Sequence, residues 1–232
     1  MRLDKYICKS TELTRNEAKR LLKMGRVQVN DETIKTGSAQ VSENCVVSIQ
    51  GKPISLLGSR YIMMHKPLDT ICSNVDEVYP SLLHFVDVER AFEMHVAGRL
   101  DADTTGLVLI TDDGKWSHNI ISPKKSCGKT YRVWLADPIE PSVIEKFKEG
   151  VQLHNERDVT RPAQLDIIDD TEVRLTITEG KYHQVKRMFA AVGNKVVGLH
   201  REKIGQLTLG EALEPGQWRY LTQEEIDLFT PN

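Results

Sequence analysis

Residues 107–110, Leu-Val-Leu-Ile, form a wholly apolar run that is followed by the turn-forming residues Thr-Asp-Asp-Gly. A short apolar run bounded by turn residues is typical of a central, buried strand. Asp101 lies just upstream of this run. Because a carboxylate at the edge of a core is costly unless it is paired or hydrogen-bonded, we expect a cationic partner for it. The pattern therefore predicts a central strand at residues 107–110, with an ion pair that includes Asp101 near its beginning.

The rest of the larger part of the chain mixes strand-like segments with shorter helical patterns. Strand-like segments outnumber helices, and hairpin spacing recurs, as at Asp169 and Asp170, which we place in a turn. This order favours an α+β domain with a mostly antiparallel, mixed β-sheet flanked by helices. The expected strands are residues 61–64, 107–111, 130–135, 163–168, 173–178 and 196–200, and the expected helices are residues 115–122, 142–149 and 182–192.

A smaller unit precedes this domain. Residues 3–10 and 14–24 show helical patterns, and Thr14 has capping-box spacing to Glu17. Residues 26–30 then alternate as a strand, residues 46–49 form a second short apolar strand, and glycine and proline in residues 50–60 indicate a linker. We therefore expect two domains, residues 1–58 and residues 59–232.

The charge distribution indicates a polyanionic partner. The formal net charge is only −2, yet residues 1–26 carry eight basic against three acidic side chains, and residues 180–203 carry six against one, which is +5 in each. Such local patches indicate a polyanion bound at defined places, although either patch alone is more simply a solvated helix face. The basic side chains spaced to face one phosphate-bearing groove are Arg15, Lys19, Arg20 and Lys23.

Residues 180–193, GKYHQVKRMFAAVG, combine a core stripe with two adjacent cations. The apolar side chains of the stripe recur at helical spacing and are Val185, Met188, Phe189 and Val192. Lys186 and Arg187 flank the stripe, so one of them can reach a buried carboxylate while the other meets a phosphate. We interpret His183 as a hydrogen-bonded structural residue.

Tyr131 lies on the predicted strand 130–135 and shares one face of it with Val133 and Leu135. A tyrosine in this position usually fills the core and has its hydroxyl hydrogen-bonded. The alternative is a stacking platform for a base that has been removed from its helix. The strand pattern alone leaves both interpretations open.

Several other chemistries have no support in the sequence. The four cysteines lie far apart without zinc-ligand spacing, so reduced thiols are expected. Residues 127–130, Cys-Gly-Lys-Thr, are similar to the end of a phosphate-binding nucleotide loop. The first glycine of that motif would fall on Pro123, so the loop is not present. Asp101 and Asp103 could hold a magnesium ion, but alternate positions point apart on an extended strand. The lack of a long apolar run and of a signal-peptide pattern predicts a cytoplasmic protein without a membrane partner.

Three motifs, together with the N-terminal unit, resemble a known family. The motifs are GRLDADTTGLVLITDDG, KTYRVWL and EGKYHQVKRMFAAVG, in this order. They are similar to the pseudouridine synthases of the small-subunit ribosomal RNA synthase A family, and the likeness extends over nearly the whole chain. The N-terminal unit resembles the α-L RNA-binding module of a small-subunit ribosomal protein, which is a less specific signal. The resemblance implies this module at residues 1–58 and a synthase catalytic domain at residues 59–232.

The family resemblance also implies roles for individual side chains. Asp101 corresponds to the catalytic carboxylate and Lys186 to the basic residue that pairs with it. Tyr131 corresponds to the tyrosine that stacks on the uracil, and Arg99 to the arginine that fills the gap left by the flipped base. Val185 matches an aliphatic position of the pocket. The substrate-binding residues so implied are Arg99, Val185 and Arg187, and Arg187 is also the second candidate for pairing with Asp101.

The activity implied by the resemblance is isomerisation of one uridine in 16S ribosomal RNA, with position 516 as the expected target. No cofactor and no metal are expected. The expected partner is 16S ribosomal RNA or a small-subunit assembly intermediate, bound by a monomer. The alternatives are a non-catalytic RNA-binding or assembly factor, a metal-dependent nuclease using the two aspartates, and a synthase for a large-subunit RNA site.

Two positions depart from the family pattern. Asp69 in HKPLDT stands where glycine is expected, and Asp31 ends VND where glycine is usual. A non-glycine residue is strained where a turn requires positive φ. We therefore expect the local backbone at Asp69 to differ from that of the family, without an effect on the implied site.

Overall fold

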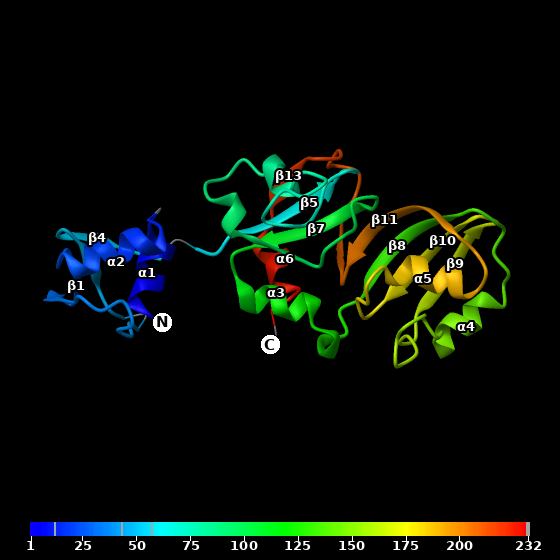
Figure 1. The fold of residues 1–232 in the computed structure, drawn as a ribbon, viewed down its shortest axis with the longest axis horizontal. Helices are drawn as coiled ribbons and strands as arrows, with labels where there is room; N and C mark the ends of the chain where they lie inside the picture. Colours follow the sequence, from blue (N-terminus) through cyan, green and yellow to red (C-terminus); the bar gives the residue numbers. More distant parts are fainter. Residues whose placement is uncertain (12, 43, 57, 231–232) are drawn as a thin grey trace. The chain divides into compact units, whose positions relative to one another are not determined.

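The computed structural model describes residues 1–11, 13–42, 44–56 and 58–230 (Figure 1). The chain divides into two compact units, residues 1–59 and residues 60–232, each with hydrophobic core residues of its own. Within the described residues, no helix has both the length and the apolar character needed to cross a membrane.

The N-terminal unit consists of two helices and a four-stranded antiparallel sheet in the order β2-β1-β3-β4. Its elements are α1 (Leu3–Ser10), α2 (Arg15–Lys23), β1 (Val27–Val29), β2 (Glu32–Thr33), β3 (Val47–Ile49) and β4 (Lys52–Ile54). Both predicted helices are confirmed, and Thr14 forms the predicted capping box with Glu17. The linker prediction was wrong for residues 52–54, because left-handed Gln50 and Gly51 turn the chain into a hairpin with β3. Residue 57 of that segment lies outside the described residues.

Asp31 and Asp69, which stand in place of the expected glycines, both have a left-handed backbone, with φ of 67° and 58°. Aspartate adopts this conformation more readily than most residues because its short polar side chain can bond locally. The Asp69 amide donates to the Ala102 carbonyl at 2.9 Å, which holds the turn against the segment that carries Asp101. The expectation that the backbone at Asp69 departs from a positive-φ turn was therefore wrong.

The larger unit is built on one sheet, which contains nine strands within the described residues. The strand order is β13-β5-β7-β11-β8-β10-β9, with β6 beside β7 and β12 beside β11. Every pair is antiparallel except β7 with β11, so the predicted mixed, mostly antiparallel sheet is confirmed. The strands are β5 (Tyr61–Lys66), β6 (His95–Ala97), β7 (Thr105–Thr111), β8 (Lys129–Leu135), β9 (Gln164–Asp169), β10 (Glu172–Ile177), β11 (Val196–Ile204), β12 (Leu207–Thr208) and β13 (Trp218–Tyr220).

The helices of this unit flank the sheet. They are α3 (Gly114–Ile121), α4 (Val143–Glu149), α5 (Gln184–Ala191) and α6 (Gln223–Asp227), and 3-10 helices cover Leu82–Phe85, Ala91–Glu93 and Pro123–Lys125. The predicted helix 182–192 begins later, at Gln184, because His183 has a left-handed backbone with φ of 47°. Asp112 and Asp113 are more than turn residues: Asp112 pairs with Arg60, and Asp113 caps α3.

The apolar run in β7 is buried on both faces. Val108 and Ile110 belong to the larger core, which extends from the 3-10 helix Leu82–Phe85 to α4 and α5, whereas Leu107 and Leu109 belong to a second core that includes side chains of α3. Figure 1 shows α5 and α4 against β8 to β10, and α3 and α6 beside β5 and β7. Because both faces are covered, the strand has no polar alternation, which explains the unusual sequence pattern.

Two strands, β6 and β11, share one edge of β7 and diverge from each other there, which we call the fork. One edge pairs with β5 along six residues, while the other edge pairs with β6 near its end and with β11 near its beginning. The parallel contact with β11 is made at Thr105 and Gly106, so the segment just before β7 lies at the point where β6 and β11 diverge. This fork is the place in the fold that presents Asp101.

Candidate active site

A pocket opens at the fork, and it is lined from four separate parts of the larger unit. The residues around it come from the segment before β7, from β8, from the stretch that runs from the end of β10 into α5, and from β11. They are Arg99, Leu100, Asp101, Thr104, Tyr131, Ile177, Gly180, Lys181, His183, Gln184, Val185, Lys186 and Leu199. Five of the residues implied by the family resemblance therefore line one pocket: Arg99, Asp101, Tyr131, Val185 and Lys186.

Asp101 begins a tight turn in which the Thr104 amide donates to the Asp101 carbonyl at 3.1 Å. Lys186 on α5 donates from Nζ to Asp101 Oδ2 at 3.1 Å and to Asp103 Oδ1 at 2.6 Å. The expectation that the two carboxylates point apart was wrong, because residues 101–104 form a turn and not an extended strand. The side chain of Asp101 remains 35% exposed, so a ligand in the pocket can reach it.

The positive charge of Lys186 is stabilised by the two aspartates beside it. Partial burial disfavours the ammonium, but hydrogen bonds to Asp103 and Asp101 outweigh this and raise the pKa of Lys186 above its ordinary value. For Asp103, burial also opposes ionisation, yet the hydrogen bond and charge of Lys186 hold the pKa of that carboxyl below its usual range. The cation is therefore present throughout the neutral pH range.

The turn that carries Asp101 is fixed from behind by Lys66 at the end of β5. This side chain is fully buried, and its Nζ donates to the carbonyls of Pro67, Ala102 and Thr104 at 3.0, 3.4 and 2.8 Å. Burial lowers the pKa of Lys66. The sequence predictions missed this residue, although a lysine two residues after the predicted strand 61–64 is a signal that could have found it.

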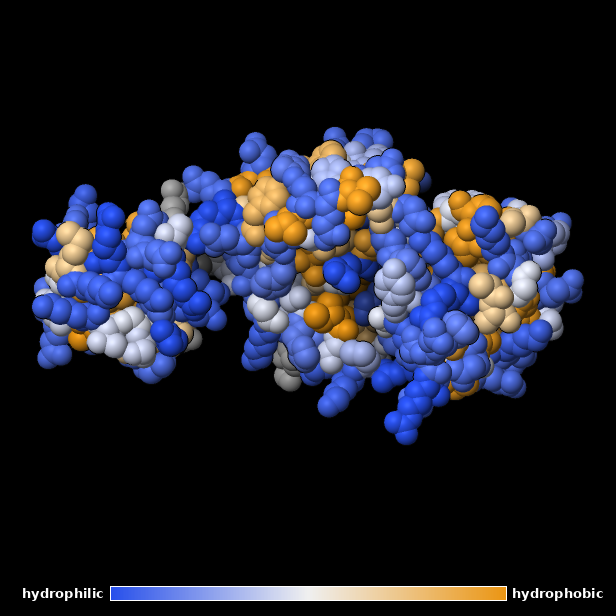
Figure 2. All heavy atoms as spheres, viewed as in Figure 1, coloured by the Kyte–Doolittle hydropathy of each residue, from blue (hydrophilic) through white to orange (hydrophobic). Residues whose placement is uncertain are grey.

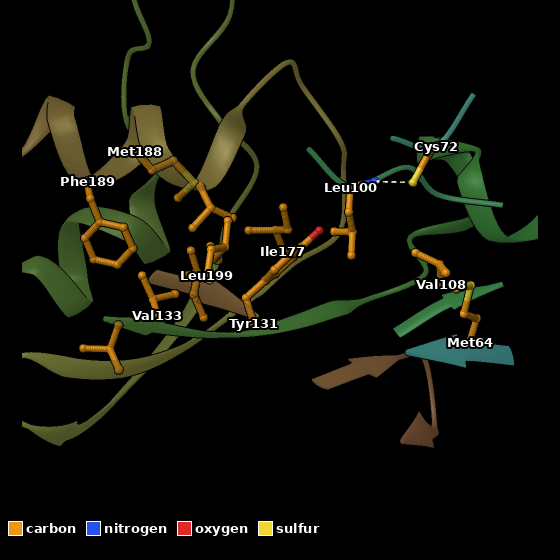
Figure 3. Close-up of a cluster of buried hydrophobic side chains, with 14 of the residues drawn as sticks. Met64, Cys72, Leu100, Val108, Tyr131, Val133, Ile177, Met188, Phe189 and Leu199 are labelled. Carbon is orange, nitrogen blue, oxygen red and sulfur yellow. Dashed lines mark hydrogen bonds between the residues drawn. The ribbon is translucent and has the colours of Figure 1, made fainter. Parts of the chain in front are cut away.

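Tyr131 lies at the pocket wall, almost fully buried, among the side chains of the larger core (Figure 3). Arg201 on β11 is 1% exposed; its Nη1 donates to the Tyr131 hydroxyl at 3.4 Å. The same guanidinium donates to the Gly98 carbonyl at 2.6 Å and to the Leu107 carbonyl at 2.8 Å. Arg201 thus joins Tyr131, the segment before Arg99 and strand β7, although the predicted strand 196–200 ended before it.

The two parts of the chain also match known families. Residues 60–191 match the sequence model of the RNA pseudouridylate synthase family, and residues 1–47 match that of the S4 domain. The chain belongs to the RNA pseudouridylate synthase family. The resemblance found in the three motifs is thereby confirmed, as is the order of an S4 module followed by a synthase domain.

Relatives of this synthase match it over nearly their whole length. The ribosomal small subunit pseudouridine synthase A of Vibrio cholerae is 58% identical over 226 residues, covering 97% of this chain and 98% of the relative. The protein of the same name from Haemophilus influenzae is 50% identical over 228 residues, covering 98% of both. A crystal structure of a pseudouridylate synthase has 49% sequence identity and a TM-score of 0.73, covering 99% of this chain and 100% of that one.

Arg99 and Arg187 occupy different places around the synthase pocket. Arg99 lines the pocket and is exposed. Arg187 pairs with Glu156 at 2.9 Å and also donates to the Tyr182 carbonyl at 2.9 Å and to the His154 carbonyl. Lys186 therefore makes the contact with Asp101, and Arg187, the second candidate for it, is engaged elsewhere.

His183 was interpreted as a structural residue, but it lies beside the carboxylate of the synthase pocket. Its Nε2 is 3.5 Å from Asp101 Oδ1, and it lines the pocket. The contact depends on the left-handed backbone at His183, which turns the side chain away from the helix that follows. No local sequence pattern signals such a conformation at a histidine, so only the tertiary structure reveals this neighbour.

The contacts of Lys186 with Asp101 and Asp103 are relevant to the alternative of a metal-dependent nuclease. Lys186 Nζ lies within hydrogen-bonding distance of both carboxylates, the position that a divalent cation bridging Asp101 and Asp103 would take. Across residues 1–230 without positions 12, 43 and 57, no cluster of three or more His, Cys, Asp or Glu side chains is arranged to hold a metal ion. The arrangement favours a charge-paired carboxylate over a metal ligand.

Helix α2 presents the basic side chains of the S4 module to solvent. Ala18 and Leu22 are buried in the core of the N-terminal unit, so the opposite face of α2 is exposed. The visible face of this unit is predominantly hydrophilic in Figure 2. The four predicted phosphate-binding side chains are all exposed: Arg15, Lys19, Arg20 and Lys23.

Proposed function

We propose that this synthase converts one uridine of small-subunit (16S) ribosomal RNA, at position 516, to pseudouridine, with Asp101 as the catalytic carboxylate. The observation that carries the proposal is the convergence of Asp101, Lys186, Tyr131 and Arg99 on one pocket. The names of the relatives support the small ribosomal subunit as the source of the substrate. The substrate in our proposal is the RNA or a partly assembled particle, and the enzyme acts as a monomer in the cytoplasm.

The reaction exchanges one bond of the ribose for another. The bond from C1′ to N1 of uracil breaks, the base turns within the pocket, and a bond forms between C1′ and C5. The C5 proton is lost and N1 gains a proton, so substrate and product are isomers and no redox reagent is consumed. Asp101 acts by one of two routes, as a nucleophile or as the base that removes a ribose proton. Lys186 Nζ lies 3.1 Å from Asp101 Oδ2, so a positive charge stands beside the carboxylate in either route.

The target base must leave the RNA stack to reach Asp101, because C1′ and C5 are inaccessible in stacked RNA. Extrusion costs a few kcal/mol, and stacking on an aromatic ring returns about 1 to 3 kcal/mol per base. In our proposal Tyr131 contacts the uracil, Val185 forms an apolar side of the pocket, and exposed Arg99 occupies the gap left in the RNA.

Mapping pseudouridine in 16S ribosomal RNA transcripts, in large-subunit RNA transcripts and in reconstituted small-subunit particles after incubation with the protein tests this proposal. The expected result is a single new pseudouridine at position 516. Modification of large-subunit RNA alone would identify the other synthase class. Binding without any product would favour a non-catalytic assembly factor, and cleaved RNA would favour a nuclease.

The basic face of α2 is expected to bind the RNA backbone. Replacing Arg15, Lys19, Arg20 and Lys23 together by glutamine should weaken RNA affinity by about tenfold or more at low salt. The negative slope of log affinity against log salt should become shallower by about 2 to 4, since each phosphate contact contributes about 0.7 to 0.9 to its magnitude. Filter binding over a salt series measures both quantities, and kcat at saturating RNA should stay near that of the wild type.

A control for this prediction, which removes two lysine charges from another helix, is available on α4. Lys146 and Lys148 are exposed on that helix and lie outside the pocket. Replacing both by glutamine should leave the salt slope nearly unchanged. An unchanged slope in the α2 variant would show that the RNA is bound without this helix face.

A further inference from the structure

Tyr182 is an exposed aromatic side chain at the edge of the pocket. It is 72% exposed, and its neighbours in the chain, Lys181 and His183, both line the pocket. Exposed tyrosines are common, so exposure alone carries no argument. The distinguishing feature is that this ring stacks on His183, which itself lies beside the Asp101 carboxylate.

Several contacts hold the ring. It stacks on the His183 ring with centroids 3.7 Å apart and planes at 21°, and His183 Nε2 is in turn 3.5 Å from Asp101 Oδ1. The Tyr182 carbonyl accepts a hydrogen bond from Arg187 at 2.9 Å, and Arg187 is itself paired with Glu156. His183 also has a left-handed backbone, a conformation that costs about 1 kcal/mol or more and is common at functional sites. The pair of rings is therefore preorganised.

The surroundings indicate which ligand this platform fits. One face of the Tyr182 ring is covered by His183, while most of the side chain is open to solvent. The basic side chains of Arg99 and Lys186 line the neighbouring pocket. A flat apolar surface next to positive charge matches a nucleobase attached to a phosphate backbone, since stacking tolerates any base and the cations attract phosphate.

We propose that the open face of Tyr182 stacks on the base of the nucleotide adjacent to the target uridine, so that Tyr182 is a substrate-binding residue. This inference rests on the proposed function, because it requires RNA in the pocket. Flipping the uridine removes a stacking partner from its neighbour in the RNA. The Tyr182–His183 pair replaces that partner and fixes the distance from the neighbouring base to Asp101.

The test compares Tyr182→Ala, Tyr182→Phe and wild type on a short RNA fragment containing the target uridine. Tyr182→Ala should raise KM by about tenfold, within the range of about 5- to 150-fold that base–aromatic stacking corresponds to, with kcat within about twofold. Tyr182→Phe should behave as the wild type because it keeps the ring. Tyr220→Ala is the matched control, since Tyr220 is 50% exposed on edge strand β13 of the same unit; it should leave KM unchanged.

A second set of RNAs separates stacking from a purely structural role. When the neighbouring nucleotide on the contacting side is abasic, the KM of the wild type should rise by the same factor of about ten. On this RNA the KM of Tyr182→Ala should equal that of the wild type. An unchanged KM for Tyr182→Ala on intact RNA would overturn the inference, as would an effect that persists in full with each neighbour abasic in turn.

Fluorescence distinguishes failure of this inference from failure of the proposed function. With 2-aminopurine in place of the neighbouring base, binding of the wild type should quench its fluorescence, and binding of Tyr182→Ala should not. Absence of product with the wild type would count against the proposed function, while the quenching comparison would still decide the role of Tyr182. Equal quenching by both proteins would overturn the stacking role.

Discussion

Asp101→Asn is expected to lower kcat for pseudouridine formation by at least about a thousandfold, within the range that a general acid–base group contributes. Asparagine keeps the shape of the side chain but can neither accept a proton as a base nor attack as an anion. The change also removes one of the two negative charges next to Lys186 while Asp103 keeps the cation paired at 2.6 Å. RNA binding should therefore remain within about threefold of wild type, since phosphate contacts dominate affinity.

Asp103→Asn is the matched control for this experiment. Asp103 also contacts Lys186, but its side chain is 70% exposed and it does not line the pocket. Its replacement should leave kcat within about tenfold of wild type, because Lys186 retains Asp101 as a partner. Single-turnover assays on the 16S fragment provide the rates. Product formation by Asp101→Asn within a few-fold of wild type would remove Asp101 from the mechanism, and equal losses in both variants would indicate that only the charge balance around Lys186 matters.

Gly106→Ala is expected to destabilise the larger unit by more than about 3 kcal/mol, among the largest effects of single substitutions. Gly106 has φ of 114°, and a Cβ atom there would lie 2.3 Å from the carbonyl oxygen of Arg201 and 2.5 Å from its amide nitrogen. Both atoms belong to the backbone of β11, so relief requires β7 and β11 to separate. Thermal unfolding should shift down by roughly 10 °C, given about 2 to 4 °C per kcal/mol at this size.

Gly193→Ala separates this clash from the cost of left-handed backbone alone. Gly193 has φ of 80° in the same unit, and a Cβ atom there meets nothing within 4 Å. Its replacement should cost only about 1 to 2 kcal/mol. Circular dichroism melts of the three proteins give the comparison. If Gly106→Ala unfolds no earlier than Gly193→Ala, the close contact between β7 and β11 is not the constraint that we infer.

The elements of regular pattern were accessible from the sequence. The apolar run in β7, the capping box of α2 and the core stripe of α5 each follow from local spacing, and each is present in the structure. The short strands β1 and β3 were predicted within the longer segments 26–30 and 46–49, whereas β4, β12 and β13 were not, because these have three residues or fewer and carry no periodicity. The linker prediction failed at residues 52–54 because proline and glycine are typical not only of linkers but also of a hairpin that ends in an edge strand.

The candidate site shows the same division between local pattern and long-range contact. The sequence by itself determined that a carboxylate lies at the beginning of a buried strand, that cations lie on a distant helix, and which family carries these motifs. Only the tertiary structure decided that Lys186 and not Arg187 meets Asp101, that the buried Lys66 and Arg201 hold the pocket walls from behind, and that His183 lies beside Asp101. The reason is that these contacts join segments roughly 30 to 100 residues apart, whose meeting depends on strand order and on left-handed backbone positions that no local periodicity encodes.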